Sequence, residues 1–161
     1  MPEFGPLTDA RLTNAARLCA PGQRIARGVA RHLRAQGFAS LLEYVPARGL
    51  RVDVIALGPR GQVWIVECKS SRADLAADRK WQGYLDWCDH FFWAVPPGFP
   101  TDILPPGCGV LIADDFDAEL VTLGPESRLA PARRKALTAD FARQAALRLQ
   151  LAQDPASAHP A

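Results

Sequence analysis

The sequence predicts an α/β domain in which a mixed β-sheet is flanked by helices on both faces. Segments with a helical period of apolar residues alternate with short runs of branched and aromatic residues. Three of these runs follow one another with only glycine-containing turns between them, which predicts an antiparallel meander of three strands. Further runs later in the chain are almost wholly apolar, as is typical of strands covered on both faces.

The helices and strands can be placed by their periodicity and their end signals. A short helix or arm is expected over residues 1–20, and helices are expected at 24–36, at about 72–88, and from 131 to about 153. Gly37 suits a helix C-cap, and Ser71 to Asp74 resembles a capping box. The strands are expected at 41–45, 50–57, 62–69, 91–95, 109–113 and, as an edge, 119–123.

The chain has 161 residues, of which 48% are hydrophobic and 22% are charged. A chain of this length buries roughly 70% of its unfolded surface as one domain. We expect a single domain over residues 1–153, with a core at about 24–113 and a disordered tail at 154–161. No apolar run approaches the roughly 20 residues that span a bilayer. A soluble cytoplasmic protein with no membrane partner is therefore expected.

The two turns of the meander predict how its strands align. Each turn offers three loop residues that end in glycine, at 47–49 and at 59–61. This pattern suits a type I turn followed by a left-handed residue. If both hairpins close around loops of this length, Glu43 lies opposite Asp53, and Asp53 lies opposite Glu67. The three carboxylates then form one row.

This row of acids ends beside Lys69, which shares a strand face with Glu67. Opposed, poorly hydrated carboxylates repel one another and favour a bound cation. Mg²⁺ or Mn²⁺ prefers such oxygen ligands, and a neighbouring lysine can orient or deprotonate a water or stabilise developing charge. Alternatively, Glu67 and Lys69 form a structural ion pair and Asp53 is an ordinary acid at a strand end. The spacing alone leaves both interpretations open.

Positive charge is concentrated in two parts of the chain, although the net charge is only +2. Arginines dominate the segment before Asp53, the centre is acidic, and Arg133-Arg134-Lys135 is basic again. Guanidinium groups match phosphate oxygens, so these parts either bind a polyanion such as DNA or form an ordinary solvated surface. The candidate nucleic-acid-binding residues are Arg27, Arg31, Arg51, Lys80, Tyr84, Arg133 and Arg134.

Asp53 and, beyond a hairpin, Glu67-Cys68-Lys69 resemble the PD-(D/E)XK nuclease superfamily over about residues 24–112. A longer string is similar to the MmcB-like DNA-repair proteins across nearly the whole chain. It comprises Arg51-Val-Asp53, Glu67-Cys-Lys69-Ser-Ser71, Asp74, Asp78-Arg-Lys80-Trp81, Tyr84 and Cys88-Asp89.

The resemblance implies a restriction-endonuclease-like three-layer core. It also implies that Asp53 and Glu67 are metal ligands, helped by the backbone carbonyl of Cys68. Lys69 would be the catalytic lysine, and Glu43 would support the site or bind a second ion.

The chain departs from the superfamily pattern in two places. Position 52 is Val rather than Pro, and the first helix has no acid between Arg24 and Gln36, so a ligand that some members carry is absent. Some recombination nucleases also carry QxxxY on the next helix. Here Lys80 stands four residues before Tyr84, and the two could share a helix face and touch a phosphate. The alternative is a surface lysine beside a core tyrosine.

The sequence thus supports functions from different classes. The first is a metal-dependent DNA endonuclease of DNA repair that hydrolyses phosphodiester bonds, with Asp53, Glu67 and Lys69 as catalytic residues and Mg²⁺ or Mn²⁺ as cofactor. The second is a non-catalytic module that binds DNA or recruits repair proteins on a nuclease fold. A third is a structural interaction protein whose acids form ordinary ion pairs. The first two imply DNA and other repair proteins as partners and a nucleoid-associated location.

Overall fold

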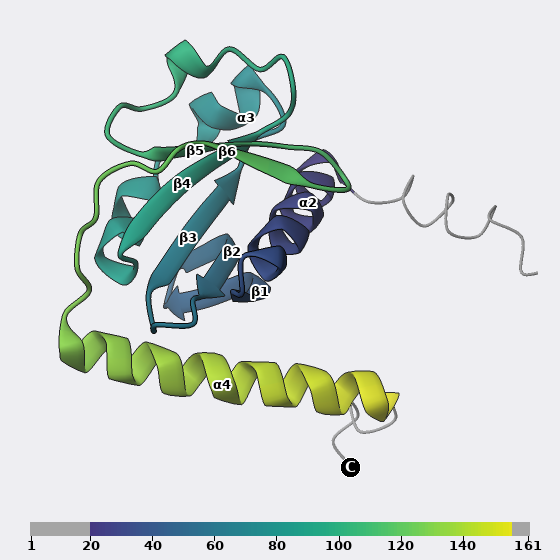
Figure 1. Cartoon of the computed structure of the whole chain (residues 1–161), viewed down its shortest axis with the longest axis vertical. Helices are drawn as coiled ribbons and strands as arrows, with labels where there is room; N and C mark the ends of the chain where they lie inside the picture. Colours follow the sequence, from purple (N-terminus) through teal and green to yellow (C-terminus); the bar gives the residue numbers. More distant parts are fainter. Residues whose placement is uncertain (1–19, 156–161) are drawn as a thin grey trace, which may run out of the picture.

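A six-stranded mixed sheet lies at the centre of the molecule, with helices on both of its faces (Figure 1). The structure is a computed structural model, and it describes residues 20–155. All but the last residue of the expected arm at 1–20, and most of the expected tail at 154–161, therefore lie outside the described residues. The strands are β1 (Ala39–Ala47), β2 (Leu50–Leu57), β3 (Val63–Cys68), β4 (His90–Val95), β5 (Gly109–Ala113) and β6 (Ala118–Thr122). The helices are α2 (Pro21–Ala35), α3 (Arg72–Ala77) and α4 (Pro131–Gln153), with the short 3₁₀ helices η1 (Trp81–Trp87) and η2 (Thr101–Ile103).

The strands are arranged in the sheet in the order in which they occur in the chain. β1, β2 and β3 form the predicted antiparallel meander. β4 and β5 then continue the sheet in parallel with β3, and β6 closes it as an antiparallel edge. The predicted α/β fold class, a mixed sheet between helices, is confirmed.

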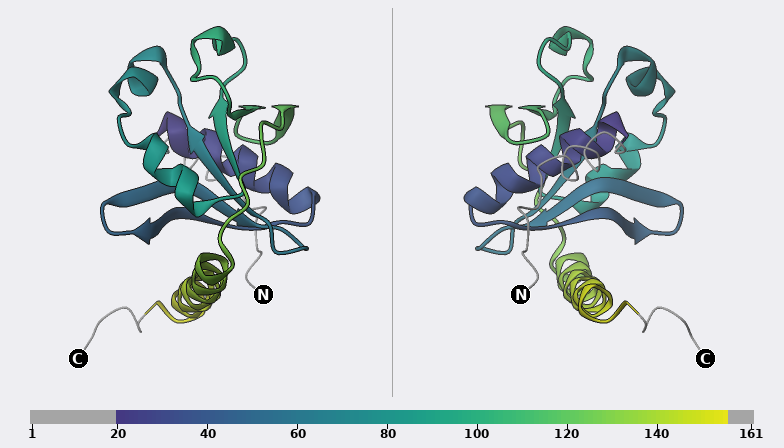
Figure 2. Two further views of the ribbon diagram at one scale, coloured as in Figure 1. Left: turned by 90° about the vertical axis from the view of Figure 1, so that its left-hand side faces the viewer. Right: turned by 90° about the vertical axis from the view of Figure 1, so that its right-hand side faces the viewer.

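One face of the sheet is covered by α2. Ile25, Val29 and Leu33 of this helix pack on Val54 and Val66 in one buried apolar cluster. The apolar stripe of α2 therefore faces the sheet, as the amphipathic pattern of the sequence predicts. Figure 2 shows α2 on one side of the sheet and η1 on the other.

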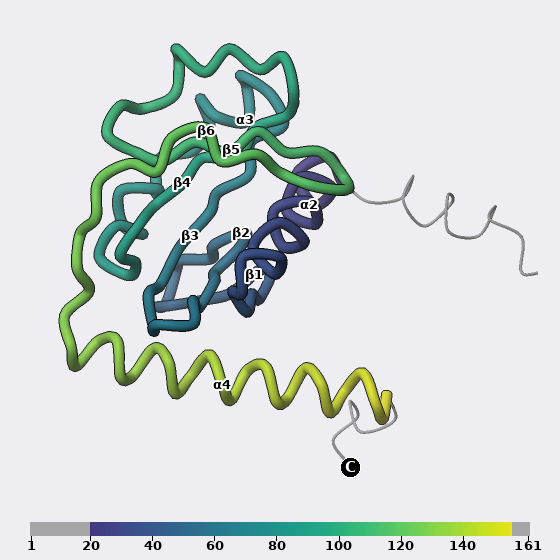
Figure 3. The backbone as a smooth tube through the Cα atoms, in the orientation of Figure 1, coloured from purple at the N-terminus to yellow at the C-terminus, as the bar shows by residue number. Residues whose placement is uncertain are grey.

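The other face is covered by η1 and by the first half of α4. Tyr84 of η1 and Leu137 and Phe141 of α4 belong to a second buried cluster that contains Ile65 and Trp93 of the sheet. Figure 3 shows α4 running across the end of the sheet where β3 begins. No helix within residues 20–155 is both long and apolar enough to cross a bilayer.

The prediction of one helix over residues 72–88 is wrong. α3 ends at Ala77, Asp78 has an extended backbone (ψ 112°), and the chain resumes as η1 at Trp81. The Asp78 carboxylate accepts a hydrogen bond from the backbone N–H of Lys80 at 2.9 Å. This local bond competes with the helical path, as acidic side chains at turns commonly do.

The hairpin between β2 and β3 has the predicted register. Val54 lies opposite Val66, and the backbone N–H of Gly58 donates to the carbonyl oxygen of Gln62 at 2.8 Å. The next position along the strands therefore sets Asp53 opposite Glu67.

The hairpin between β1 and β2 also has the predicted register, although its loop is shorter than predicted. Its loop has two residues rather than three, and a bulge lies between Tyr44 and Ala47. Beyond the bulge Tyr44 pairs with Val52, so Glu43 still stands opposite Asp53. The extra residue is absorbed by the bulge, which is how an antiparallel pair usually accommodates one.

Candidate functional site

Most of the predicted site residues line one open cavity of about 900 Å³ at the carboxyl end of β3. The first turn of α2 forms part of its wall, and the break between α3 and η1 forms another part. The predicted residues on its lining are Glu43, Arg51, Asp53, Glu67, Lys69, Lys80 and Tyr84. The fold thus brings together the predicted catalytic residues, the third carboxylate and three of the predicted DNA-binding residues.

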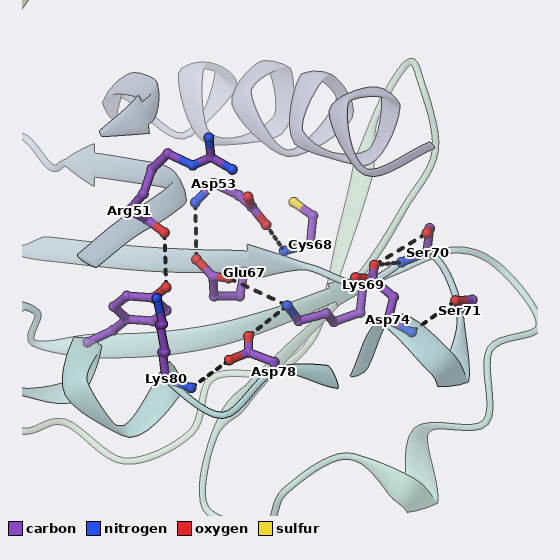
Figure 4. A network of polar contacts seen from close by, with 11 residues as sticks. Arg51, Asp53, Glu67, Cys68, Lys69, Ser70, Ser71, Asp74, Asp78 and Lys80 are labelled. Carbon is purple, nitrogen blue, oxygen red and sulfur yellow. Dashed lines mark hydrogen bonds and ion pairs between the residues drawn. The ribbon is translucent and has the colours of Figure 1, made fainter. Parts of the chain in front are cut away.

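Asp53 and Glu67 stand where the ladder between β2 and β3 ends, and each carboxylate binds a backbone N–H of the other strand (Figure 4). Glu67 Oε1 accepts from the N–H of Asp53 at 3.1 Å, and Asp53 Oδ2 accepts from the N–H of Cys68 at 2.8 Å. The carboxylates thereby satisfy donors that the strand ladder leaves unpaired. Each acid keeps its second oxygen outside these two bonds.

The environment of both acids disfavours their charged forms. Burial, reinforced by the charge of Asp53, raises the pKa of Glu67 to about 8. Burial also raises the pKa of Asp53, although the hydrogen bond from Cys68 and the charge of Lys69 oppose this shift. Burial and mutual repulsion thus oppose negative charge on both acids at once, and the charge of Lys69 offsets this only in part.

Lys69 follows β3 directly, and its buried ammonium group binds Asp78 (Figure 4). Nζ of Lys69 lies 2.7 Å from Asp78 Oδ2 but 3.7 Å from Glu67 Oε2. Burial disfavours the charge on Lys69, but the hydrogen bond to Asp78 and the charge of Glu67 outweigh burial and raise the pKa of Lys69. Lys69 is therefore held as a cation.

Asp78 is the member of this cluster to which the sequence analysis gave no role. Asp78 belongs to the string of residues that resembles the MmcB-like proteins, and this was the one sequence feature that could have marked it as a site residue. Its position depends on the break after α3, and a continuous helix would have placed it differently.

Glu43 enters the cavity from a strained position in β1. Its φ is +51°, in the left-handed region that favours glycine. Arg148 of α4 donates hydrogen bonds to the carbonyl oxygens of Leu42 and Glu43, at 2.5 and 3.4 Å, and so holds the strand at this point. The carboxylate of Glu43 lies 3.4 Å from Arg51 Nη1, so it is paired with a cation.

The remaining predicted DNA-binding residues near the cavity differ in their surroundings. Lys80 is exposed, whereas Tyr84 is buried and its hydroxyl donates to the carbonyl oxygen of Arg51 at 3.0 Å. This environment agrees with the alternative of a surface lysine beside a core tyrosine. Arg27 lines a neighbouring cavity of about 270 Å³. Arg31 lies farther along α2, with its guanidinium 5.9 Å from the centre of the Phe116 ring.

Arg133 and Arg134 hold α4 against the rest of the fold rather than lining the cavity. The guanidinium of Arg134 donates to both oxygens of Asp89, at 2.8 and 2.6 Å, and to the carbonyl oxygen of Gly61 at 2.7 Å. Arg133 donates to the carbonyl oxygen of Asp86 at 2.6 Å. Both side chains are thus engaged with the protein itself, which their sequence pattern did not show.

Comparison with known families identifies the chain. A family model described as "DNA repair protein MmcB-like" matches residues 5–156. The chain belongs to the MmcB-like DNA repair protein family. This MmcB-like chain is also 62% identical to a solved structure of a protein of unknown function from Silicibacter pomeroyi. The match covers 89% of this chain and 97% of that one, with a TM-score of 0.85. No curated protein matches.

The donor set of the MmcB-like site fits a small divalent cation. Buried Glu67 and half-buried Asp53 offer two carboxylates with raised pKa values, and such oxygen donors are the ligands of Mg²⁺ and Mn²⁺. Glu43 is paired with Arg51. Within residues 20–155, no group of three or more His, Cys, Asp and Glu side chains is arranged to hold a metal ion. A cation at this site would therefore rest on Asp53 and Glu67 and complete its shell with backbone oxygen and water.

Proposed function

We propose that this MmcB-like protein is a metal-dependent DNA endonuclease of DNA repair that hydrolyses phosphodiester bonds. One observation supports this function above the others: buried Glu67 and half-buried Asp53, both with raised pKa values, stand beside a buried lysine on an open cavity. Asp53 and Glu67 would hold Mg²⁺ or Mn²⁺, which when bound supplies an activated water and stabilises charge on the phosphate. DNA would be the substrate, and other repair proteins would be partners near the nucleoid.

In this proposal Lys69 acts through its charge. Its pKa is raised by Asp78 and Glu67 despite burial, so it is poorly suited to remove a proton from water. An ammonium group at this place stabilises the negative charge that develops on phosphate oxygens in the transition state. Exposed Arg51, Arg79 and Lys80 on the cavity wall would bind the DNA backbone.

A second candidate is a non-catalytic DNA-binding module. The hydrogen bonds of Asp53 and Glu67 to backbone N–H groups support it, as does the ion pair of Lys69 and Asp78 at 2.7 Å. In this case the polar cluster terminates the strand ladder, and the cationic wall of the cavity holds DNA without hydrolysis.

A metal titration followed by a cleavage assay distinguishes the two. Calorimetry with Mn²⁺ and Mg²⁺ should show saturable binding that is lost in Asp53→Asn and Glu67→Gln. The matched control is Glu119→Gln, which changes an exposed acid on β6 and should bind metal as the parent does. Linear, nicked, branched and lesion-bearing DNA in manganese would then reveal cleavage. Metal binding or cleavage that survives in both site variants would contradict the endonuclease proposal, and DNA binding without metal binding would favour the module.

A further inference from the structure

A second groove lies at the opposite end of β3. Two cavities of about 490 and 560 Å³ adjoin there, because Arg60, Gln62, Trp64 and Leu123 line both. Trp64 precedes Lys69 by five residues, which is roughly 17 Å along an extended strand. The indole also packs in the cluster beneath α2, whereas Glu67 points to the other face by strand alternation. The groove is therefore separate from the cavity that contains the carboxylates.

We propose that this groove binds an unpaired nucleotide of single-stranded DNA, with its base stacked on Trp64. The indole is held in a fixed orientation by its neighbours. Its ring centre lies 4.5 Å from that of Phe38 and 4.7 Å from that of Phe92, and His90 meets it edge-on at 5.7 Å. Trp64 is only partly buried and borders both cavities. A rigid and accessible indole is the surface on which single-stranded bases stack.

The charges around the groove favour an anionic ligand. Among its lining residues, Arg134 is neutralised by Asp89, and Arg128 lies 3.6 Å from Glu126. Arg60 is exposed at the tip of the hairpin between β2 and β3 and has no carboxylate partner within residues 20–155. Its guanidinium is therefore available for a phosphate oxygen.

The other lining groups suit the remaining parts of a nucleotide. The side-chain oxygen of Gln62 accepts the backbone N–H of Arg60 at 2.9 Å, which leaves the amide NH₂ to donate to a base edge. Leu120 and Leu123 add an exposed apolar wall. A base inside a duplex has both faces covered by its neighbours, so only an unpaired base can reach Trp64.

The role of Trp64 can be tested with two ligands of equal charge. Fluorescence anisotropy compares a labelled oligothymidine with an abasic oligomer of the same length, which keeps the phosphates and lacks the bases. The parent protein should prefer the oligothymidine by about tenfold, the scale of one base stacked on an aromatic side chain. Trp64→Leu should bind both ligands equally. A partial loss of folded Trp64→Leu protein affects both ligands alike and cancels in the ratio. A preference for bases that persists in this variant overturns the proposal.

The role of Arg60 has a matched control within the chain. Arg48 and Arg60 are both exposed, both lie in hairpin turns, and both precede a glycine, but only Arg60 borders the groove. Arg60→Ala should weaken oligothymidine binding several-fold and lower the log–log salt slope by about 0.7, the value for one phosphate contact to a single strand. Arg48→Ala should change neither quantity. Equal losses in both variants overturn the proposal.

Two further measurements distinguish the groove from the carboxylate cavity, and DNA from an acidic peptide. The inference rests on DNA binding in the proposed function and not on hydrolysis, so the oligothymidine should bind equally well with and without Mg²⁺ or Mn²⁺. If oligothymidine binding requires the metal, the strand enters the carboxylate cavity instead and the groove is not the site. An oligoglutamate peptide of equal charge should not displace the oligothymidine. Equal displacement would make the groove a site for an acidic peptide and overturn the proposal.

Discussion

Lys69 and Asp78 form an ion pair with an N–O distance of 2.7 Å, and each side chain is less than one-tenth exposed. The pair joins the end of β3 to the break between α3 and η1. Because both groups are shielded from water, neither is easily compensated by solvent when its partner is removed.

Lys69→Met is expected to lower the free energy of unfolding by about 3 kcal/mol, since it leaves Asp78 buried without its cation. Chemical denaturation measures this loss. The control is Lys80→Met, which removes an exposed cation from the same cavity and should change stability by less than about 0.5 kcal/mol. If Lys69→Met is as stable as the parent protein, the Asp78 carboxylate does not need the charge of Lys69 to remain buried.

The same substitution separates catalysis from binding. If the proposed endonuclease activity is present, Lys69→Met should lower the single-turnover cleavage rate by on the order of 10²-fold, since one electrostatic group in the transition state is lost. The dissociation constant for DNA should be unchanged. Single-turnover assays at saturating manganese, below the unfolding temperature of the variant, measure both quantities. An unchanged rate would exclude Lys69 as a catalytic residue.

The raised pKa of Glu67 predicts how stability depends on pH. Its ordinary pKa is 4.5, whereas burial and the charge of Asp53 raise it to about 8, so the folded state holds the proton more tightly than the unfolded chain. The stabilisation from this group is complete below pH 4.5 and is lost as the pH rises toward 8. In metal-free buffer, the melting temperature should fall across this window, and Glu67→Gln should flatten the fall. A wild-type profile that rises with pH, or an unaltered fall in the variant, would contradict the expectation.

The arginines of the cavity and of α4 should respond differently to substitution. Arg51→Ala and Lys80→Ala should each weaken DNA binding for all sequences and reduce the salt slope by about 1. Arg134→Ala should leave the salt slope unchanged but lower stability, because Asp89 loses its bidentate partner. Anisotropy at several salt concentrations and thermal denaturation measure the two effects. A reduced salt slope in Arg134→Ala would instead show that Arg134 contacts the DNA backbone.

Two glycines of α2 provide a matched pair for testing the packing of this helix. A Cβ at Gly28 would overlap the backbone carbonyl oxygens of Asp114 and Asp117, whereas a Cβ at Gly22 meets nothing within 4 Å. Gly28→Ala should therefore destabilise the fold by about 2 kcal/mol through overpacking. Gly22→Ala should be neutral or stabilising by less than about 1 kcal/mol. Thermal denaturation distinguishes them, and similar melting temperatures would place α2 farther from the turn between β5 and β6.

Local signals in the sequence predicted the features that depend on local structure. The glycine-ended turns determined the alignment of Asp53 with Glu67, because loop length fixes the register of a hairpin. The alignment of Glu43 was also predicted, although its loop is shorter and a bulge makes up the difference.

Features that depend on distant contacts were not predicted. Arg134 appeared as part of a basic run, but its partner Asp89 precedes it by 45 residues, and no local pattern links the two. Asp78 fitted the apparent helix over residues 72–88. In the structure its backbone is extended, and its carboxylate pairs with Lys69, which follows β3. No local pattern predicted the left-handed backbone of Glu43 either. The carbonyl oxygens at this point of β1 accept hydrogen bonds from Arg148, which lies more than 100 residues later in the chain.

Asp89 also determines how the domain can unfold. Its carboxylate binds Arg134 and the backbone N–H groups of Val63 and Leu129, so one buried charge depends on β3, on the segment before α4 and on α4 itself. Burial opposes its ionisation, but the hydrogen bonds from Arg134, Leu129 and Val63 outweigh burial and lower the pKa of Asp89 to about 2. Detaching the first turns of α4 would leave this anion without its counterion. Amide hydrogens at the start of α4 should therefore exchange with solvent only when the central strands open as well, in one cooperative unit.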